Sequence, residues 1–190
     1  MLKFQSAQRG TTMMEVLISI VIVVLGLLGL AGLQSRAAVA EMESFQRAQA
    51  IILLQDMADR INANRRNSMD YVTAGVGTGT AVQQCAALTA APRDLCEWHN
   101  ALLGAAESAG GLQVGAMIGA RGCVTNIVPA MPREFQIAVV WQGVVKTAAP
   151  GATDCGVGQY GDELTRRAVT ANVIIGCLQN DLATGLCVTP

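Results

Sequence analysis

The chain has 190 residues, enough for one moderate domain and a separate helix. Hydrophobic residues make up 52% and charged residues 14%, a balance more apolar than an ordinary soluble domain, and much of the excess lies before residue 34. The net charge of −1 and the aromatic content of 4% offer neither the basic face nor the stacking platforms of a nucleic-acid-binding protein, so we expect no nucleic-acid partner.

The first element we expect is a membrane-spanning helix over residues 11–33. This segment contains one charged residue, Glu15, at the head of an apolar run from Val16 to Leu33. At ~1.5 Å per residue the helix would be roughly 35 Å long, enough to cross a ~30 Å hydrocarbon core. Lys3 and Arg9 precede it, and no basic residue follows until Arg36. The positive-inside rule therefore predicts that residues 1–10 stay in the cytoplasm and that the remainder is exported.

A cleaved signal peptide is the alternative for this segment. Ala38-Val39-Ala40 before Glu41 has the small-x-small form of a cleavage site. The apolar run of 18 residues is longer than the ~7–15 residues of a signal-peptide core, which favours a retained helix.

Glycines recur every three residues in the membrane segment, at Gly26, Gly29 and Gly32. Small residues on one stripe permit close approach of a second helix in lipid. We therefore assign these glycines to helix packing, although glycine is also generally more frequent in membrane helices.

The helix is expected to continue through residues 34–66 as an amphipathic half. Leu54, Met57, Ala58 and Ile61 follow the i, i+3, i+4, i+7 spacing, and Ala50 and Ile51 extend that stripe by one turn. Phe45 and Ile52 fall outside it. Asp56 and Arg60 are spaced for a surface ion pair, and three asparagines predict a helix end near residue 64: Asn62, Asn64 and Asn67.

Residues 67–190 are predicted to form a globular head. A glycine- and threonine-rich section, YVTAGVGTGTAVQQ, indicates a linker, and Asp94 is a plausible cap for a short helix, LCEWHNALLGAAES. Three strands are expected: GLQVGAMIG, EFQIAVVWQG and TRRAVTANVIIG. In the second strand, alternating apolar residues share one face. The pattern predicts an α+β fold, with a three- or four-stranded antiparallel sheet against the long helix.

Six cysteines lie on the exported side, and an even number there predicts disulfides in an oxidising compartment such as a bacterial periplasm. Six cysteines allow 15 pairings. Short loops close most easily, so we pair Cys85 with Cys96 and Cys177 with Cys187. Cys123 and Cys155 then remain for each other.

The residues around Glu15 resemble a known processing site. A basic leader ends at Gly10, and Glu15 is the fifth residue after it. QRG–TTMMEV followed by an apolar helix resembles the class III leader of type IV prepilins and type II secretion pseudopilins, with Thr11 in place of the commoner phenylalanine. The resemblance implies that a prepilin peptidase cuts after Gly10 and methylates the amine of Thr11. It also implies that Glu15 pairs with the amino terminus of a neighbouring subunit during filament assembly.

Three further segments resemble the PilV-type minor pilins, or type IV pilus modification proteins: LGLLGLAGLQ, QDMADRINANR and DLCEWHNAL. The resemblance implies a pilin-like fold and a role in pilus initiation, assembly or the tip complex. It implies an inner-membrane protein with a periplasmic head that later reaches the cell surface. Its partners would be other minor and major pilins, the prepilin peptidase, the assembly platform and the membrane. A type II secretion pseudopilin and an adhesive module displayed on the pilus remain alternatives.

Enzymatic activity is not expected. His99 is the one histidine, and its spacing from Cys85 and Cys96 matches no standard zinc pattern. A Cys–His nucleophile would need a free thiolate, which a disulfide removes. The chain contains no G-x-S-x-G motif and no phosphate-binding loop, so we expect no catalytic site, metal or cofactor. His99 is expected at the surface or half-buried.

Overall fold

The computed structural model describes residues 12–77, 79, 81–104, 108–109, 112–113 and 117–177. The chain forms two compact units, the first ending at Met42 and the second beginning at Glu43. Helix α1 (Met13–Ala63) is continuous by its hydrogen bonding and supplies residues to both units. It ends one residue before the asparagine-marked position that the sequence predicts, and a 3₁₀ helix, η1 (Arg65–Tyr71), follows it.

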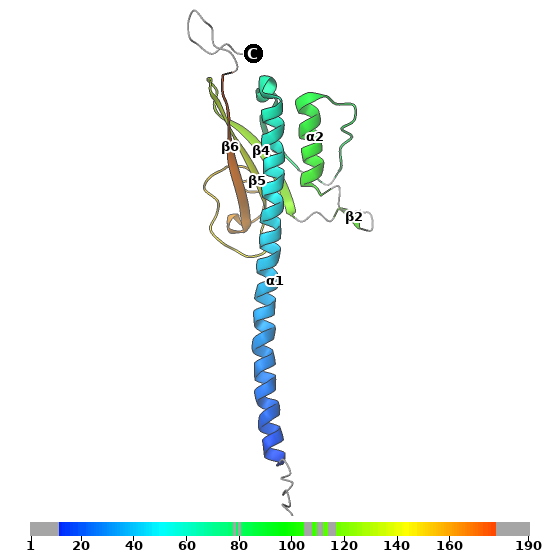
Figure 1. Cartoon of the computed structure of the whole chain (residues 1–190), viewed down its shortest axis with the longest axis vertical. Helices are drawn as coiled ribbons and strands as arrows, with labels where there is room; N and C mark the ends of the chain where they lie inside the picture. The colour runs from blue at the N-terminus through cyan, green and yellow to red at the C-terminus, as the bar shows by residue number, and fades with distance from the viewer. Residues whose placement is uncertain are drawn as a thin grey trace, which may run out of the picture. The chain divides into compact units, whose positions relative to one another are not determined.

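The second unit has the predicted α+β fold, with α1 packed on a small antiparallel sheet. Four strands lie in the order β1 (Thr73–Val76), β4 (Ile118–Val128), β5 (Arg133–Gln142) and β6 (Arg166–Ile175), and each neighbouring pair is antiparallel. The remaining elements are α2 (Ala90–Leu102), the two-stranded β2 (Ser108–Ala109) and β3 (Leu112–Gln113), and η2 (Glu163–Thr165). From Glu43 onward, α1 crosses the sheet and α2 lies beside it (Figure 1).

The main core lies between α1 and the face of the sheet that α1 covers. The alternation predicted for β5 is confirmed, because its four inward side chains are all buried: Phe135, Ile137, Val139 and Trp141. From α1 they meet a stripe that includes Leu54, Met57 and Ile61. Burying each such side chain contributes about 1.5–3 kcal/mol, so this contact holds α1 on the sheet. The predicted stripe is shifted slightly, because Ile51 is exposed and Leu53 is buried instead.

Trp98 of α2 joins three elements on this same face. Its ring is fully buried, and its indole Nε1 donates a hydrogen bond to the backbone oxygen of Leu53 in α1, at 2.9 Å. The ring also lies directly against Gly122 of β4, where a Cβ atom would overlap three of its carbon atoms. Because Gly122 has no side chain, the Trp98 ring can occupy the space that a Cβ atom would fill.

The opposite face of the sheet is covered by the connection between β5 and β6. A second, smaller core forms there from Cys123, Ala138, Val140 and Cys155, with Tyr160 and Ala168 packed against it. The disulfide between Cys123 and Cys155 ties this connection to β4. The sheet thus has a helical layer on one face and a disulfide-bound loop on the other.

Two sequence predictions differ from the structure. The segment GLQVGAMIG, expected to form one strand, contains β3 (Leu112–Gln113) of the two-stranded sheet and the start of β4 at Ile118, and β4 extends to Val128. Residues 114–116 lie outside the described residues. Its inward positions include Gly122 and Val124, so β4 lacks the apolar alternation of β5. The section expected to be a linker contains β1, whose pairing with β4 is irregular between Thr73 and Val76. Partner strands, rather than local sequence, fix both elements.

The start of the short helix was also wrong. α2 begins at Ala90, with Thr89 at the cap position, and Asp94 lies inside the helix. Asp94 accepts hydrogen bonds from Arg60 and Tyr71, so its carboxylate joins elements instead of capping a helix end.

We predict that Gly122→Ala destabilises the second unit, because the added methyl group would displace the Trp98 ring. Overpacking of this kind costs about 1–3 kcal/mol. Denaturant unfolding of the detergent-solubilised chain, followed by tryptophan fluorescence, measures the change. Gly151→Ala is the matched control, because a Cβ at Gly151 meets no atom within 4 Å. Equal midpoints for the two variants would show that Trp98 does not need the space at Gly122.

Candidate functional site: the amino-terminal helix and its anchorage in the head

The first turn of α1 presents the carboxylate that the sequence analysis singled out. Thr12 caps the helix, because the backbone N–H of Glu15 donates to the Thr12 carbonyl oxygen at 3.0 Å and lies 3.3 Å from its Oγ1. Glu15 is exposed, and no side chain among residues 12–177 that the structure describes pairs with its carboxylate. Gly10 and Thr11, the predicted processing residues, lie outside the described residues.

The side chains that follow Glu15 form an exposed apolar surface. Every residue from Met13 to Leu33 is exposed, including large residues such as Ile22 and Leu28, whose exposed fractions are 64% and 65%. By length and composition, α1 is apolar enough to cross a membrane. Such a surface is far larger than the few hundred Å² of apolar patch that a soluble monomer normally exposes. It therefore requires lipid or other apolar helices around it.

Gly26, Gly29 and Gly32 lie within this surface. A Cβ atom at any of the three would meet nothing within 4 Å. These positions are open to a second helix, which is the arrangement that close packing in lipid requires.

In the second unit, two sequence segments identified by the resemblance meet around Arg60. Its guanidinium bonds Asp56 at 2.9 Å within α1, and Asp94 and Glu97 of α2 at 3.0 and 2.8 Å. The expected surface pair of Asp56 and Arg60 is therefore part of a larger network. QDMADRINANR supplies the arginine and DLCEWHNAL supplies two of the carboxylates.

The network changes the ionisation of its members. Burial opposes the charge on Arg60, but the hydrogen bonds that it donates to Glu97 and Asp56 outweigh this effect and raise the pKa of the guanidinium. Hydrogen bonds from Arg60 and Arg93 lower the pKa of Glu97. Burial, followed by the hydrogen bond to Asp94, raises the pKa of Tyr71 to about 12. Arg60 therefore stays charged and Tyr71 neutral at physiological pH, which preserves the link between α1 and α2.

A second ion pair ties α1 to β6. The Arg167 guanidinium lies 3.0 Å from one carboxylate oxygen of Glu43, and the other carboxylate oxygen accepts the backbone N–H of Val144 at 2.9 Å. Burial alone would raise the pKa of Glu43, but hydrogen bonds from Arg167, Val145 and Val144 outweigh it and lower that pKa. Glu43, in the first helical turn of the second unit, thus binds both ends of the β5–β6 connection: the backbone at Val144 and the side chain of Arg167.

Arg166 and Arg167 do not form an exposed basic patch. Arg166 is 3% exposed and donates to three backbone carbonyls of the β5–β6 connection, in addition to its 2.6 Å ion pair with Glu163. Nothing in the local sequence indicated this role, because neither arginine lies next to its long-range partners. Buried Arg166 therefore fixes the backbone of the β5–β6 connection, and Arg167 binds Glu43.

The disulfides follow the expected order where the structure describes them. Cys85 is bonded to Cys96, the pair that its short loop favoured, and Cys123 is bonded to Cys155, the pair assigned by elimination. Cys123 lies in the middle of β4. Cys177 is disulfide-bonded, and its expected partner Cys187 lies outside the described residues.

His99 is buried, and the expectation of a surface or half-buried position was wrong. Its exposed fraction is 5%. Nδ1 accepts the backbone N–H of Gly77 at 3.0 Å, and Nε2 lies 3.2 Å from the carbonyl oxygen of Ala81. Both ring nitrogens therefore hold the segment that leads from β1 to Cys85. With Cys85 and Cys96 in a disulfide, these three residues are all engaged in structural bonds.

Comparison with known proteins gives one family match. Residues 32–100 match the model of a family described as Tt1218-like, type IV pilin Tt1218. The matched region contains QDMADRINANR and all but the last two residues of DLCEWHNAL, including Trp98. No curated protein and no solved structure matches the chain. The match supports a type IV pilin, which would associate with other pilins and with the membrane, and the apolar helix agrees with membrane anchoring.

We predict that the stability of the second unit falls as the pH drops through the acidic range, and that Glu43→Gln reduces this dependence. A carboxylate whose pKa is lowered by folding stabilises above its unfolded pKa of about 4.3, and this contribution is lost as the pH falls through the folded value. Thermal unfolding at pH 7 and at lower pH measures the slope. Exposed Glu41, converted to Gln, is the control. Parallel slopes for Glu43→Gln and the unmodified chain would contradict the role of this pair.

Proposed function

We propose that the chain is a minor type IV pilin that enters the pilus, at initiation or in the tip complex, through its amino-terminal helix. One combination of observations carries the proposal. A glycine-ended basic leader and Glu15 precede an exposed apolar helix, and the helix continues into a region that matches a type IV pilin family. The segments similar to PilV-type minor pilins support the minor-pilin assignment.

In this proposal Glu15 guides assembly. Cleavage after Gly10 creates an α-amine on Thr11, four residues before Glu15 in the sequence. In the membrane the two groups neutralise each other, which lowers the cost of placing either charge near hydrocarbon. In the filament the carboxylate takes the amine of a neighbouring subunit, and this exchange sets the axial position of the incoming helix. Gly26, Gly29 and Gly32 allow the helices to approach closely.

The topology follows from the same argument. Residues 1–10 form the cytoplasmic leader, 11–33 the membrane-spanning half, 34–66 the amphipathic half and 67–190 the head. The head lies in the periplasm before assembly, where its cysteines are oxidised. The prepilin peptidase and the inner-membrane assembly platform act on the chain, which is a substrate and not an enzyme.

A type II secretion pseudopilin is the second candidate, because its leader and helix have the same features. Genes for other minor pilins beside this one favour the pilus, and genes for a secretion apparatus favour the pseudopilin.

Processing gives the first test of the proposal. We predict that the mature protein begins at Thr11, with or without a methyl group on its amine, because the leader ends at Gly10. Amino-terminal sequencing or intact mass measurement of protein from membranes reads the start directly. A mature protein that begins at Glu41 would identify a cleaved signal peptide and rule out a pilin.

The role of Glu15 gives the second test. We predict that Glu15→Ala leaves the protein processed and in the membrane but absent from sheared filaments. The variant leaves an unpaired buried ammonium in the assembled state, a loss of about 3–5 kcal/mol if the pair is fully buried. Immunoblots of membrane and filament fractions measure both outcomes. Glu41→Ala, an exposed carboxylate on the same helix, should assemble normally. Normal incorporation of Glu15→Ala would show that the carboxylate has no part in assembly.

A further inference from the structure

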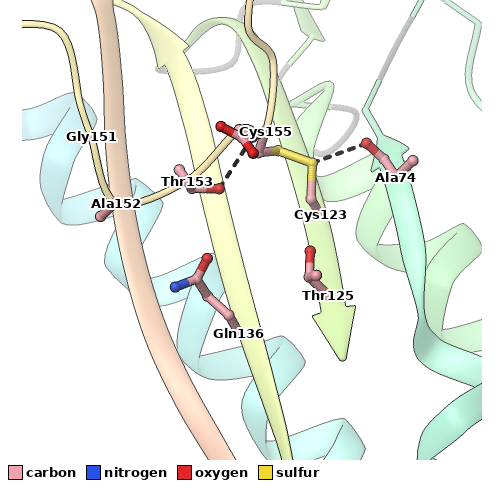
Figure 2. Close-up of a pocket in the computed structure, with 9 residues that line it drawn as sticks. Ala74, Cys123, Thr125, Gln136, Gly151, Ala152, Thr153 and Cys155 are labelled. Atoms are coloured by element: carbon pink, nitrogen blue, oxygen red, sulfur yellow. Dashed lines mark hydrogen bonds between the residues drawn. A yellow bond between two sulfur atoms is a disulfide. The ribbon is translucent and has the colours of Figure 1, made fainter. Parts of the chain in front are cut away.

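The outer face of the sheet contains a pocket that the pilin function leaves unexplained. It has a volume of about 430 Å³, within the ~300–1,000 Å³ of typical small-molecule sites. Its floor includes Thr125 of β4 and Gln136 of β5, which are directly paired across the two strands. The 151–155 segment of the β5–β6 connection forms one wall, and Ala74 of β1 lies on the other side of the disulfide (Figure 2).

The loop wall is held in place before any ligand arrives. The disulfide between Cys123 and Cys155 attaches it to β4. Arg166, buried behind it, donates to the carbonyl oxygens of Thr153 at 3.0 Å, Cys155 at 3.2 Å and Pro150 at 3.1 Å. The Thr153 hydroxyl accepts the N–H of Cys155 at 3.1 Å. A wall fixed in this way costs little ordering entropy on binding.

Three polar side chains of the pocket have no partner within the described part of the chain. They are the hydroxyl of Thr125, the amide of Gln136 and the carboxylate of Asp154. Figure 2 shows Thr125 and Gln136 below the disulfide. Together they offer donors and acceptors from the hydroxyl and amide, and acceptors from the carboxylate.

The charges and hydrogen-bonding groups of the pocket exclude several chemical classes of ligand. No lysine or arginine lines the pocket among the described residues, and Asp154 repels anions, so phosphate and acidic ligands are disfavoured. An added peptide strand is also disfavoured, because β4 and β5 are each paired on both edges. The methyl groups of Ala74 and Ala152 and the disulfide sulfurs supply apolar contacts between the polar groups.

We infer that this pocket binds one residue of a neutral carbohydrate. Sugar hydroxyls donate to Asp154 and exchange hydrogen bonds with Gln136 and Thr125, while the carbon-bound hydrogens of the ring lie against the alanines and the disulfide. The inference does not depend on pilus assembly, since every lining residue belongs to the second unit.

Saturation-transfer NMR on the detergent-solubilised full chain tests the inference. The probes are two pairs of sugars that differ by one carboxylate: galactose with galacturonate, and glucose with glucuronate. We expect transfer to at least one neutral sugar and weaker transfer to its acidic counterpart. Absence of transfer to both neutral sugars, or equal binding of neutral and acidic members, overturns the inference.

Two variants locate the binding. Gln136→Leu should weaken binding about 3- to 10-fold, the effect of one lost hydrogen bond. Gln142→Leu, on the same face of the same strand but outside the pocket, should leave binding unchanged. If Gln136→Leu does not fold, exposed Asp154→Asn replaces it, with exposed Asp59→Asn as its control. Equal binding by a pocket variant and its control shows that the sugar binds elsewhere and overturns the assignment.

Discussion

The apolar side chains from Met13 to Leu33 surround α1 on all sides, and water cannot solvate such a surface without a large cost in free energy. This part of the helix needs lipid or other helices, while the part from Glu43 onward has to pack on a water-exposed head. One continuous helix therefore satisfies two different environments. The head cannot use the first segment for its own core, so it builds that core from the face containing Leu54, Met57 and Ile61.

A small head built on one helical face needs additional links to stay in place. Trp98 and Arg60 provide them, because the first reaches the backbone of α1 and the second binds two carboxylates of α2. Both lie in the stretch that matches the type IV pilin family. Their contacts give a physical reason why QDMADRINANR and DLCEWHNAL occur together: each segment supplies polar partners for half-buried charged groups of the other.

The two faces of the sheet have different structural roles. The face toward α1 is filled by large apolar side chains and is fully committed to packing. The opposite face has a smaller core and a loop fixed by a disulfide and by buried Arg166. Fixing a long connection with a covalent bond and backbone hydrogen bonds leaves its outer surface free to vary. Such a surface can acquire binding groups without disturbing the contact between the sheet and α1.

The sequence by itself determined the long helix, its end near residue 64, the alternation of β5 and the disulfide between Cys85 and Cys96. These features depend on local periodicity or on short loop closure, which neighbouring residues encode. The pairing of Cys123 with Cys155 followed only by elimination. The tertiary structure alone decided the position of β4, the strand character of β1, the burial of His99 and the partners of Arg60 and Arg166. Each of these depends on groups far away in the chain. Gly122 shows the reason most plainly, because its role is to leave space for the Trp98 ring of another element. A residue without a side chain produces no local sequence pattern that would predict this contact.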